Sequence, residues 1–580
     1  MSSVIVIGGG ISGLASAALL AREGHDVTLL EQQATVGGRA GSWEKDGFRF
    51  DTGPSWYLMP EVFDHFYRLL GTSADEQLSL VTLDPGYRVY YEGLTEPVDV
   101  AASRDENLQL FEDVRRGSGL KLHRYLNSAE ATYDLAKRYF LYTTFASIRP
   151  LLNREVLGQL PRLSRLLLRS LWSRVAGTVR DDRLRKILGY PAVFLGSSPY
   201  LAPSMYHLMS HLDLAAGVRY PVGGFARVIA SIADLAAAEG VKIVTSATVK
   251  RIVVADGVAT GVEYVDGHKT TQFLDANIVV SAADLHHSET QLLEAEQQTY
   301  PQEYWDKRTP GPSALLLNLG VRGELPELEH HTLLFAKDWK TGFDAIFGAD
   351  QHVPAPASLY ICKPSGVDED VAPDGFENLF VLVPLPADPG LGKGGVNGKG
   401  DKAIEALADV VIEQIATWAG IPDLASRITL RRTVGPADFV TSLNAWRGTA
   451  LGPAHTLRQS AFFRAGNVSR KVRGLYFVGS STIPGVGLPM CLISAELLIK
   501  RLHGDTSTGP MAEPLARTVG AAASEQTEVE TEVGTETEAE LAAVPEAEVD
   551  AEPEAAPAPP ASRRVILPAG TAFDVGPAAE

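Results

Sequence analysis

The chain has 580 residues, and its 52 Lys and Arg against 71 Asp and Glu give a net charge of −19. This length suggests at least two domains and an ample apolar core. Because the first apolar run begins at once and no run reaches about eighteen residues, we expect neither a signal peptide nor a membrane-spanning helix. Two cysteines, Cys362 and Cys491, cannot build a disulfide framework, which favours a reducing cytoplasm. We expect Cys491 to be a small buried hydrophobe, and we expect no nucleic-acid partner and no bound metal.

A buried strand over residues 4–7 is predicted to run into a glycine motif made of Gly8, Gly10 and Gly13. Gly8 allows a tight turn, Gly10 lets a pyrophosphate reach the backbone, and Gly13 lets helix and strand pack closely. A helix follows, and its N-terminus is expected to face the phosphates.

The helix is expected over residues 14–23, and a second strand, Asp26–Leu30, ends at Glu31. Glu31 lies 18 residues beyond Gly13, where a carboxylate can accept hydrogen bonds from a ribose diol. The order of strand, turn, helix and strand predicts a dinucleotide site. A glycine-rich turn that binds nothing is the alternative.

Two further turns decide between NAD and FAD. Gly37-Gly38-Arg39-Ala40 follows the second strand, and Asp51-Thr-Gly53-Pro54 comes after it. Together with the first motif they resemble the fingerprint of the flavoproteins that include amine oxidases and carotenoid desaturases. The resemblance implies that the turn with Gly38 and Arg39 lies along the FAD pyrophosphate and that the turn with Gly53 and Pro54 approaches the flavin. We therefore predict FAD as the cofactor.

Near the other end of the chain, a strand over Leu475–Val478 leads into a turn rich in glycine and proline, and a helix is expected to start near Leu488. This segment resembles the signature of bacterial-type phytoene desaturases, and the resemblance covers about residues 1–505. It implies that the positive end of the helix faces the flavin pyrimidine ring. Ile483 and Ser480 depart from the residues most common in that signature, which bears on the product rather than on the flavin site.

A third segment lies between the two ends. Residues 220–225 predict a turn into a helix, residues 241–249, 251–254 and 278–283 predict strands, and Gly257 and Gly267 predict hairpin turns. The resemblance implies that the backbone at Val249 meets the adenine and that the turn with Ala282 lies near the cofactor; a plain β-meander is the alternative. The predicted cofactor-binding residues are Gly8, Gly10, Ser12, Gly13, Glu31, Gly38, Arg39, Gly53, Pro54, Val249, Ala282, Gly479, Ser480, Gly487, Leu488 and Met490.

Residues 151–188 are locally basic and predict an amphipathic helix. Apolar residues recur along it at helical spacing beside Trp172, and arginines flank them. The apolar positions are Leu160, Leu163, Leu167, Leu171 and Val175, and the arginines are Arg162, Arg165, Arg169 and Arg174. The pattern suits a helix in a membrane interface. A helix packed on its own core fits equally well, and the hydrocarbon substrate that the resemblance implies favours the membrane.

The expected fold is α/β, α+β overall, of the Rossmann-type FAD-binding flavoprotein kind with a parallel core sheet. Residues 1–85, 215–300 and 426–505 are predicted to form a discontinuous cofactor domain, and residues 86–214 and 301–425 an inserted substrate-binding and membrane-facing domain. Residues 506–580 are predicted to be an acidic disordered tail, since residues 511–580 hold fifteen acids against three arginines. In this tail, a partner-binding role for residues 563–567 is a further hypothesis.

The resemblance implies FAD-dependent desaturation of phytoene in carotenoid biosynthesis, by repeated removal of a hydride and a proton, toward lycopene. No catalytic base can be chosen, and Asn444, Trp446 and Gly448 are candidates for the cleft wall near the flavin. His207 and His211 lack a third ligand and are expected to be structural. We expect a peripheral protein on the inner face of the cell membrane, with oxygen or quinone as electron acceptor. The alternatives are a C30 or hydroxylated-carotenoid desaturase, a ketolase, an isomerase, a flavin amine oxidase, or a non-catalytic flavin-binding scaffold.

Overall fold

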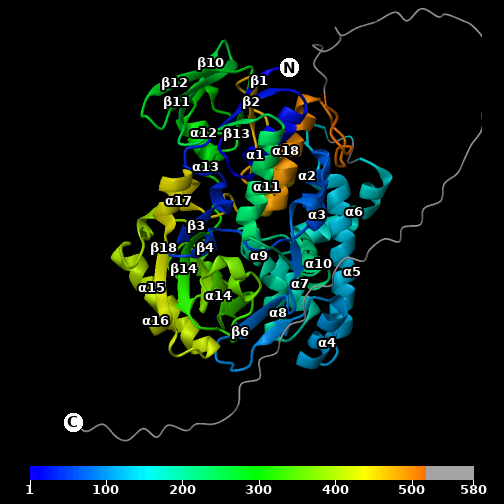
Figure 1. Cartoon of the computed structure of the whole chain (residues 1–580). Coiled ribbons are helices and arrows are strands. Elements are labelled where there is room, and N and C mark those ends of the chain that lie inside the picture. Colours follow the sequence, from blue (N-terminus) through cyan, green and yellow to red (C-terminus); the bar gives the residue numbers. More distant parts are fainter. Residues whose placement is uncertain (148, 150–151, 518–580) are drawn as a thin grey trace, which may run out of the picture. The chain divides into compact units, whose positions relative to one another are not determined.

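The computed structural model of the chain describes residues 1–147, 149 and 152–517 (Figure 1). These residues belong to one compact unit, Met1–Gly520. The described part of this unit holds five β-sheets, of which the two largest have five and seven strands, together with many helices, so the fold is mixed α/β as expected. The hypothesis about residues 563–567 lies outside the described residues.

The first sheet is parallel and has the strand order β19-β13-β1-β2-β9. Its strands come from distant parts of the chain and are β1 (Ser3–Ile7), β2 (Asp26–Leu30), β9 (Lys242–Val244), β13 (Ile278–Ser281) and β19 (Leu475–Phe477). A sheet covered on both faces needs strands that are apolar at every position. β1 meets this condition, because Val4 and Val6 belong to one core cluster and Ile5 and Ile7 to another.

Three helices cover the face of Val4 and Val6, namely α1 (Ile11–Arg22), α11 (Gly224–Ala238) and α18 (Leu488–Leu502). A second, three-stranded sheet covers the other face, made of β10 (Thr248–Ala255), β11 (Val258–Val265) and β12 (Thr271–Asp275). The strand that we expected over residues 241–249 is two strands. The chain leaves the parallel sheet at Ser246, where φ is +53°, and starts β10 two residues later.

A seven-stranded sheet forms the second main layer, in the order β18-β14-β17-β16-β15-β6-β7. Its neighbours pair antiparallel except for β15 with β6. The strands are β6 (Tyr87–Tyr91), β7 (Val98–Val100), β14 (Ser313–Arg322), β15 (His331–Phe335), β16 (Leu359–Cys362), β17 (Phe376–Leu385) and β18 (Ile428–Val434). Helix α15 (Lys402–Ala419) packs on one face of this sheet. We had grouped β18 with the cofactor segments, but it pairs with β14; the domain boundaries as a whole stay a prediction.

The segment expected as one amphipathic helix over residues 151–188 is three helices. Ser170 caps the second, because its hydroxyl accepts from Ser173 N at 3.2 Å, and Asp181 caps the third. The helices are α6 (Arg154–Leu168), α7 (Leu171–Thr178) and α8 (Asp182–Gly189). The expected stripe therefore does not share one face. Leu163, Leu171 and Val175 are buried, whereas Leu160 is 47% exposed and Leu167 is half-buried.

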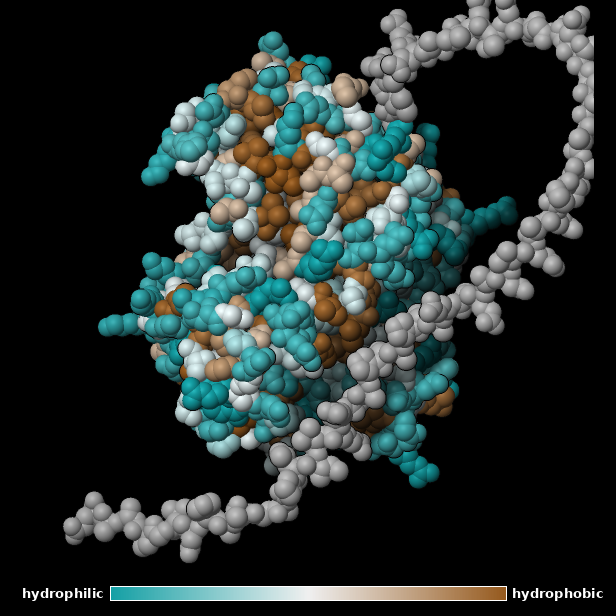
Figure 2. Space-filling view, viewed as in Figure 1, coloured by the Kyte–Doolittle hydropathy of each residue, from teal (hydrophilic) through white to brown (hydrophobic). Residues whose placement is uncertain are grey.

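The remaining elements connect these layers. Two small two-stranded antiparallel sheets pair β3 (Ser42–Lys45) with β4 (Phe48–Asp51) and β5 (Leu80–Thr82) with β8 (Arg219–Pro221). The other α-helices are α2 (Pro60–Leu69), α3 (Ala74–Gln77), α4 (Arg104–Val114), α5 (Gly119–Ala136), α9 (Pro191–Phe194), α10 (Met209–Leu214), α12 (Leu285–Gln291), α13 (Gln302–Trp305), α14 (Trp339–Phe347), α16 (Leu424–Arg427) and α17 (Pro436–Leu443). On the face shown in Figure 2, apolar residues gather in the middle, over the alanine-rich α11. Among the described helices, none is both long and apolar enough to cross a membrane.

The first residues of the predicted tail, 506–517, are described by the structure and contact the body. Lys500, which is fully buried, donates hydrogen bonds to the carbonyl oxygens of Ser507 and Gly509 at 2.8 and 2.7 Å. Farther along, Leu515 is buried and its N–H donates to the Leu69 carbonyl oxygen at 2.9 Å. Residues 506–517 are thus packed on the body, and they hold one acid against one arginine, so they lack the acidic composition on which the prediction of a tail rested.

Candidate functional site

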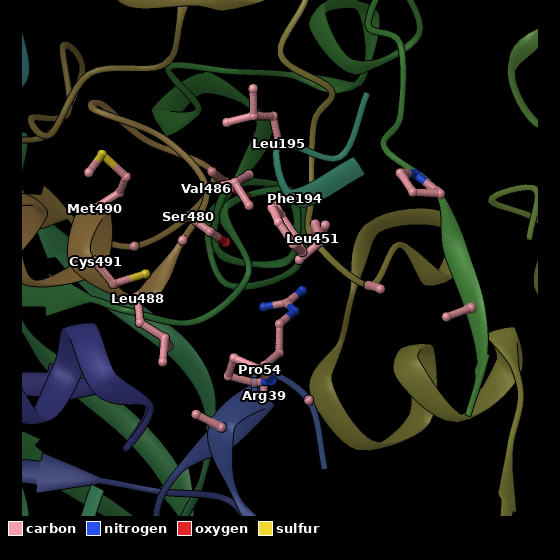
Figure 3. A pocket seen from close by; sticks show the side chains of 18 of the residues that line it. Arg39, Pro54, Phe194, Leu195, Leu451, Ser480, Val486, Leu488, Met490 and Cys491 are labelled. Atoms are coloured by element: carbon pink, nitrogen blue, oxygen red, sulfur yellow. The ribbon is translucent and has the colours of Figure 1, made fainter. Parts of the chain in front are cut away.

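A cavity of about 1030 Å³ is lined by residues of both main sheets. Fifteen of the sixteen predicted cofactor-binding residues line it, although they come from segments spread from Gly8 to Met490. The exception is Gly13, which lies behind the turn. Figure 3 shows Arg39 and Pro54 on one side of this space and Ser480, Leu488 and Met490 on another. The fold therefore brings the two ends of the chain together around one space.

The glycine turn between β1 and α1 has the geometry that each glycine was expected to provide. Gly8 has φ +98°, which favours glycine. A Cβ at Gly13 would collide with the carbonyl oxygen of Gly8, so glycine is needed for the close packing of helix and strand. A Cβ at Gly10, in contrast, would meet nothing within 4 Å. The backbone at Gly10 therefore faces open space, and the N-terminus of α1 points its free N–H groups there.

The turn that carries Arg39 lies directly against the glycine turn, since a Cβ at Gly38 would be 3.3 Å from the Gly10 Cα. The Arg39 Nη2 atom lies 3.7 Å from a carboxylate oxygen of Asp284, but its buried Nε and Nη2 atoms have no hydrogen-bond partner among the described residues. A partly buried guanidinium with two free donor atoms fits an anionic ligand. The open space at Gly10 and the free donors of Arg39 together fit the pyrophosphate of FAD.

Glu31 ends β2 and is 6% exposed. Its carboxylate accepts from the N–H of Gly9 at 2.6 Å and from the N–H of Gln33 at 2.8 Å. A carboxylate can accept about four hydrogen bonds, so it retains capacity for a ribose diol. Glu31 thus has a second role that the sequence did not reveal, because it also holds the glycine turn in place.

The C-terminal part of the site is the turn between β19 and α18. Gly479 and Gly487 have φ +114° and +119°, and Gly487 is the N-cap of α18. The Gly479 N–H donates to the Ser494 hydroxyl at 3.1 Å, which ties the turn to the helix that follows. The positive end of α18 therefore points into the cavity at Leu488, where it can stabilise negative charge on a bound group.

The contact between the two halves of the site runs through α1 and α18. The Ser12 hydroxyl donates to the carbonyl oxygen of Cys491 at 3.2 Å, across 479 residues of sequence. Burial raises the pKa of Cys491, so its thiol is neutral at pH 7. Cys491 is 8% exposed and belongs to the core that α1 and α18 share, as expected for a small hydrophobe.

The third predicted segment closes the cavity on its remaining side. Val249 is buried at the start of β10, and the Ala282 N–H donates to the Ile7 carbonyl oxygen at 2.8 Å. Both residues line the cavity. The three-stranded sheet beside them therefore contributes to the site and is not only a cover for the parallel sheet.

The rest of the cavity is mainly apolar and extends under the seven-stranded sheet. Its walls carry aromatic and aliphatic side chains, among them Tyr190, Phe194, Leu333, Phe335, Trp339 and Phe343. A polar chain interrupts this wall. The Tyr360 hydroxyl lies 2.6 Å from the Ser55 hydroxyl and 2.7 Å from Nδ1 of His331, and Trp56 stacks on His331 with 4.2 Å between ring centroids. Sequence reasoning missed this group, although Ser55 and Trp56 directly follow the Gly53-Pro54 turn.

Of the three residues proposed for the cleft wall, one lies there. Asn444 lines the cavity and its side-chain amide donates to Gln32 at 3.1 Å. Trp446 is buried against Trp305, with 5.1 Å between ring centroids, and does not line the cavity. Gly448 also lies outside it, because its backbone is held by the Ser313 hydroxyl at 2.6 Å. The chain turns at Arg447, where φ is +53°, and this turn directs the two residues into the core.

His207, His330 and His331 are buried inside the protein. Burial lowers the pKa of His207 to about 3, and its ring nitrogens contact the Ser204 carbonyl and the Ser128 hydroxyl. Among the described residues, His330, His331 and Cys362 form the cluster whose ligand atoms lie within 4.8 Å of one another. Burial lowers the pKa of His330 to about 3 and raises that of Cys362 to about 12, so both side chains are neutral at pH 7.

Comparison with known proteins shows consistent similarity along most of the chain. Residues 11–497 match the family described as flavin containing amine oxidoreductase. The chain is 41% identical over 503 residues to a carotenoid 3,4-desaturase of Haloarcula japonica, covering 87% of this chain and 98% of that protein. It is 33% identical over 503 residues to a zeta-carotene-forming phytoene desaturase of Myxococcus xanthus, covering 86% and 93%. An oxidoreductase structure from Methanosarcina mazei aligns with a TM-score of 0.57 at 16% identity, covering 86% of this chain and 100% of that chain, which shows a shared fold.

Proposed function

This chain belongs to the carotenoid desaturases of the flavin containing amine oxidoreductase family, and we propose that it desaturates phytoene toward lycopene. It is an FAD-dependent oxidoreductase. The observation that carries the proposal is the single cavity in which the dinucleotide cradle continues into a long apolar wall. A hydrocarbon without polar groups can be held only by such a wall.

In this proposal the residues of the chain bind, orient and exclude water. Gly10, Arg39 and the N-terminus of α1 would hold the pyrophosphate, and Glu31 the ribose. When bound, FAD would supply the acceptor for a hydride from a carbon beside a polyene double bond, and the proton lost from the neighbouring carbon would be released to solvent. The N-terminus of α18 at Leu488 would stabilise the negative charge that this transfer brings. Aromatic residues of the apolar wall would keep the reacting carbons dry and aligned.

A second candidate is desaturation of a carotenoid at carbons 3 and 4. It is favoured by the 41% identity to the Haloarcula japonica protein, which exceeds the 33% identity to the Myxococcus xanthus phytoene desaturase. Both candidates use the same cofactor site and differ in which part of the polyene lies at the flavin. A C30 or hydroxylated carotenoid desaturase would differ from the proposal in the polyene that it holds, whereas a ketolase or an isomerase would differ in the reaction.

We also propose peripheral contact with the inner face of the cell membrane. The support is on α6, where Leu157, Leu160 and Leu168 are 44%, 47% and 77% exposed. On the inner side of the same helix, Leu163 and Leu167 line the cavity. A helix that is apolar on both sides can lie between bilayer and cavity and admit a hydrocarbon. Oxygen or a membrane quinone is the proposed electron acceptor.

Of the four arginines in residues 151–188 that we expected to contact lipid headgroups, two bind the protein and two are exposed. Arg162 donates to the Ser128 carbonyl oxygen at 2.9 Å, and Arg174 donates to the Ser128 hydroxyl at 2.8 Å. Both therefore bind the protein itself. Arg165 and Arg169 are exposed and remain candidates for the membrane surface.

The test is expression in cells that make phytoene and, separately, in cells that make lycopene, followed by chromatography and absorption spectra of the pigments. Gly10→Val is the matched inactive control. Conversion of phytoene to coloured products supports the proposal, and conversion of lycopene alone supports the second candidate. Turnover of polyamines with hydrogen peroxide release would instead identify an amine oxidase. Flavin binding with no turnover in any assay would identify a scaffold.

A further inference from the structure

A second cavity, of about 520 Å³, lies beside an exposed part of the large cavity. Phe462 and Phe463 line both cavities and are 47% and 60% exposed. Phe462 packs on Phe145, another residue of the large cavity, with 4.3 Å between ring centroids. The two cavities therefore share a rim of exposed aromatic side chains.

Arginines on tyrosine rings form the wall of this second cavity. The guanidinium carbon of Arg308 lies 4.1 Å from the ring centroid of Tyr304, and that of Arg470 lies 5.4 Å from the ring centroid of Tyr300. The two tyrosine rings pack together at 4.8 Å. Cation–π contacts of this kind hold a guanidinium flat on a ring while its edge stays free.

The positive charge of the cavity is not neutralised by carboxylates. Arg458 and Arg464 also line it, and none of its four arginines forms an ion pair with any described residue. Arg464 donates to main-chain carbonyl oxygens, among them that of Thr482 at 2.9 Å, and Arg308 donates to the carbonyl oxygen of Arg458 at 2.9 Å. Glu289 interacts electrostatically with Arg470, but burial raises the pKa of Glu289 to about 7, so it supplies only part of a counter-charge.

We propose that the second cavity binds the phosphate of an anionic phospholipid and so docks the aromatic rim shared by the two cavities on the bilayer. Guanidinium edges are suited to phosphate oxygens, and exposed phenylalanines beside them are suited to the acyl boundary. The net charge of −19 includes −12 from residues 511–580, and the remaining −7 of residues 1–510 still disfavours an anionic surface. A local group of unpaired arginines would therefore also set the orientation in which the protein binds. This inference rests on the proposed function for its hydrocarbon substrate.

The test compares the full-length holoenzyme with the triple variant Arg308→Gln, Arg458→Gln, Arg470→Gln. Binding is measured by co-flotation with vesicles of phosphatidylcholine, with and without phosphatidylglycerol. We expect the triple variant to bind phosphatidylglycerol vesicles on the order of a hundredfold more weakly and to match the wild type on pure phosphatidylcholine. Arg464 is left intact, because it also contacts the Ser480 carbonyl oxygen at the flavin turn.

The matched control removes three exposed arginines elsewhere, Arg227→Gln, Arg251→Gln and Arg322→Gln. It changes the net charge equally and should retain nearly all binding. Equal loss in both triple variants would overturn the proposal in favour of net charge alone, and wild-type binding by the first variant would overturn it outright. Flavin absorbance verifies that each variant is folded. Since vesicle binding is measured without substrate, its outcome is independent of whether the enzyme desaturates phytoene.

Discussion

Gly10 and Gly13 stand three residues apart in one motif, yet the structure predicts opposite consequences for their substitution. At Gly10 the backbone has an ordinary φ of −72° and a Cβ would meet nothing within 4 Å. Gly10→Val should therefore change the free energy of unfolding of the apoprotein by no more than about 0.5 kcal/mol. It should nevertheless abolish FAD binding, because the side chain fills the space proposed for the pyrophosphate.

At Gly13, a Cβ would collide with the carbonyl oxygen of Gly8. Gly13→Ala should therefore destabilise the apoprotein itself by about 1–3 kcal/mol or more, the usual cost of overpacking a core. The assay is thermal unfolding of flavin-free protein, together with flavin absorbance per protein after reconstitution. The reasoning is refuted if Gly10→Val keeps stoichiometric FAD, or if Gly13→Ala apoprotein unfolds at the wild-type temperature.

Three further expectations concern the ribose contact, the C-terminal segment and pH. Glu31→Ala should weaken FAD binding by roughly 1.5–3 kcal/mol, as titration of apoprotein would measure, because a charge-assisted contact is lost; unchanged affinity would exclude the ribose role. Deleting residues 518–580 should leave pigment formation nearly unchanged, whereas deleting 506–580 should lower the unfolding temperature, because Leu515 and its neighbours leave the core; equal stability of the two truncations would contradict this. Burial lowers the pKa of His65, but hydrogen bonds and charge from Glu496 and Glu513 outweigh it and raise the pKa above 6.5. The ion pairs of protonated His65 with Glu496 and Glu513 therefore stabilise the folded protein fully below pH 6.5 and weaken as pH rises through the raised pKa. Limited proteolysis after residue 505 should then become faster with rising pH in the wild type but not in His65→Gln.

The cofactor half of the fold could be predicted because its signals are local. β2 occupies Asp26–Leu30 and α18 begins at Leu488, as expected, since a glycine or a proline-rich turn marks each boundary. The parallel order of β1 with its neighbours follows from the crossover helices between them. Sixteen residues were predicted to bind the cofactor, and all but Gly13 line the cavity; that they bind FAD stays a prediction.

The substrate half of the fold was harder to predict from the sequence, because its strands pair with strands that are distant along the chain. β14 is a buried run whose partners, β17 and β18, lie far along the chain, and no local signal shows which sheet β18 joins. Periodicity alone also suggested one helix where Ser170 begins a new one. Likewise, Tyr360 contacts Ser55 and His331 contacts Tyr360 although the three residues are far apart in sequence, so no local motif could reveal this group.

The hydrogen bond from Ser12 to Cys491 spans 479 residues, and it has a consequence for how the protein is made. During synthesis, β1 and α1 emerge first, but β13 and α18, against which they pack, emerge hundreds of residues later. The apolar surfaces of the first segment must meanwhile remain uncovered, which exposes the nascent chain to aggregation or to capture by chaperones. The flavin pocket can be completed only after α18 has been synthesised, so cofactor binding must come late in the synthesis and folding of the chain.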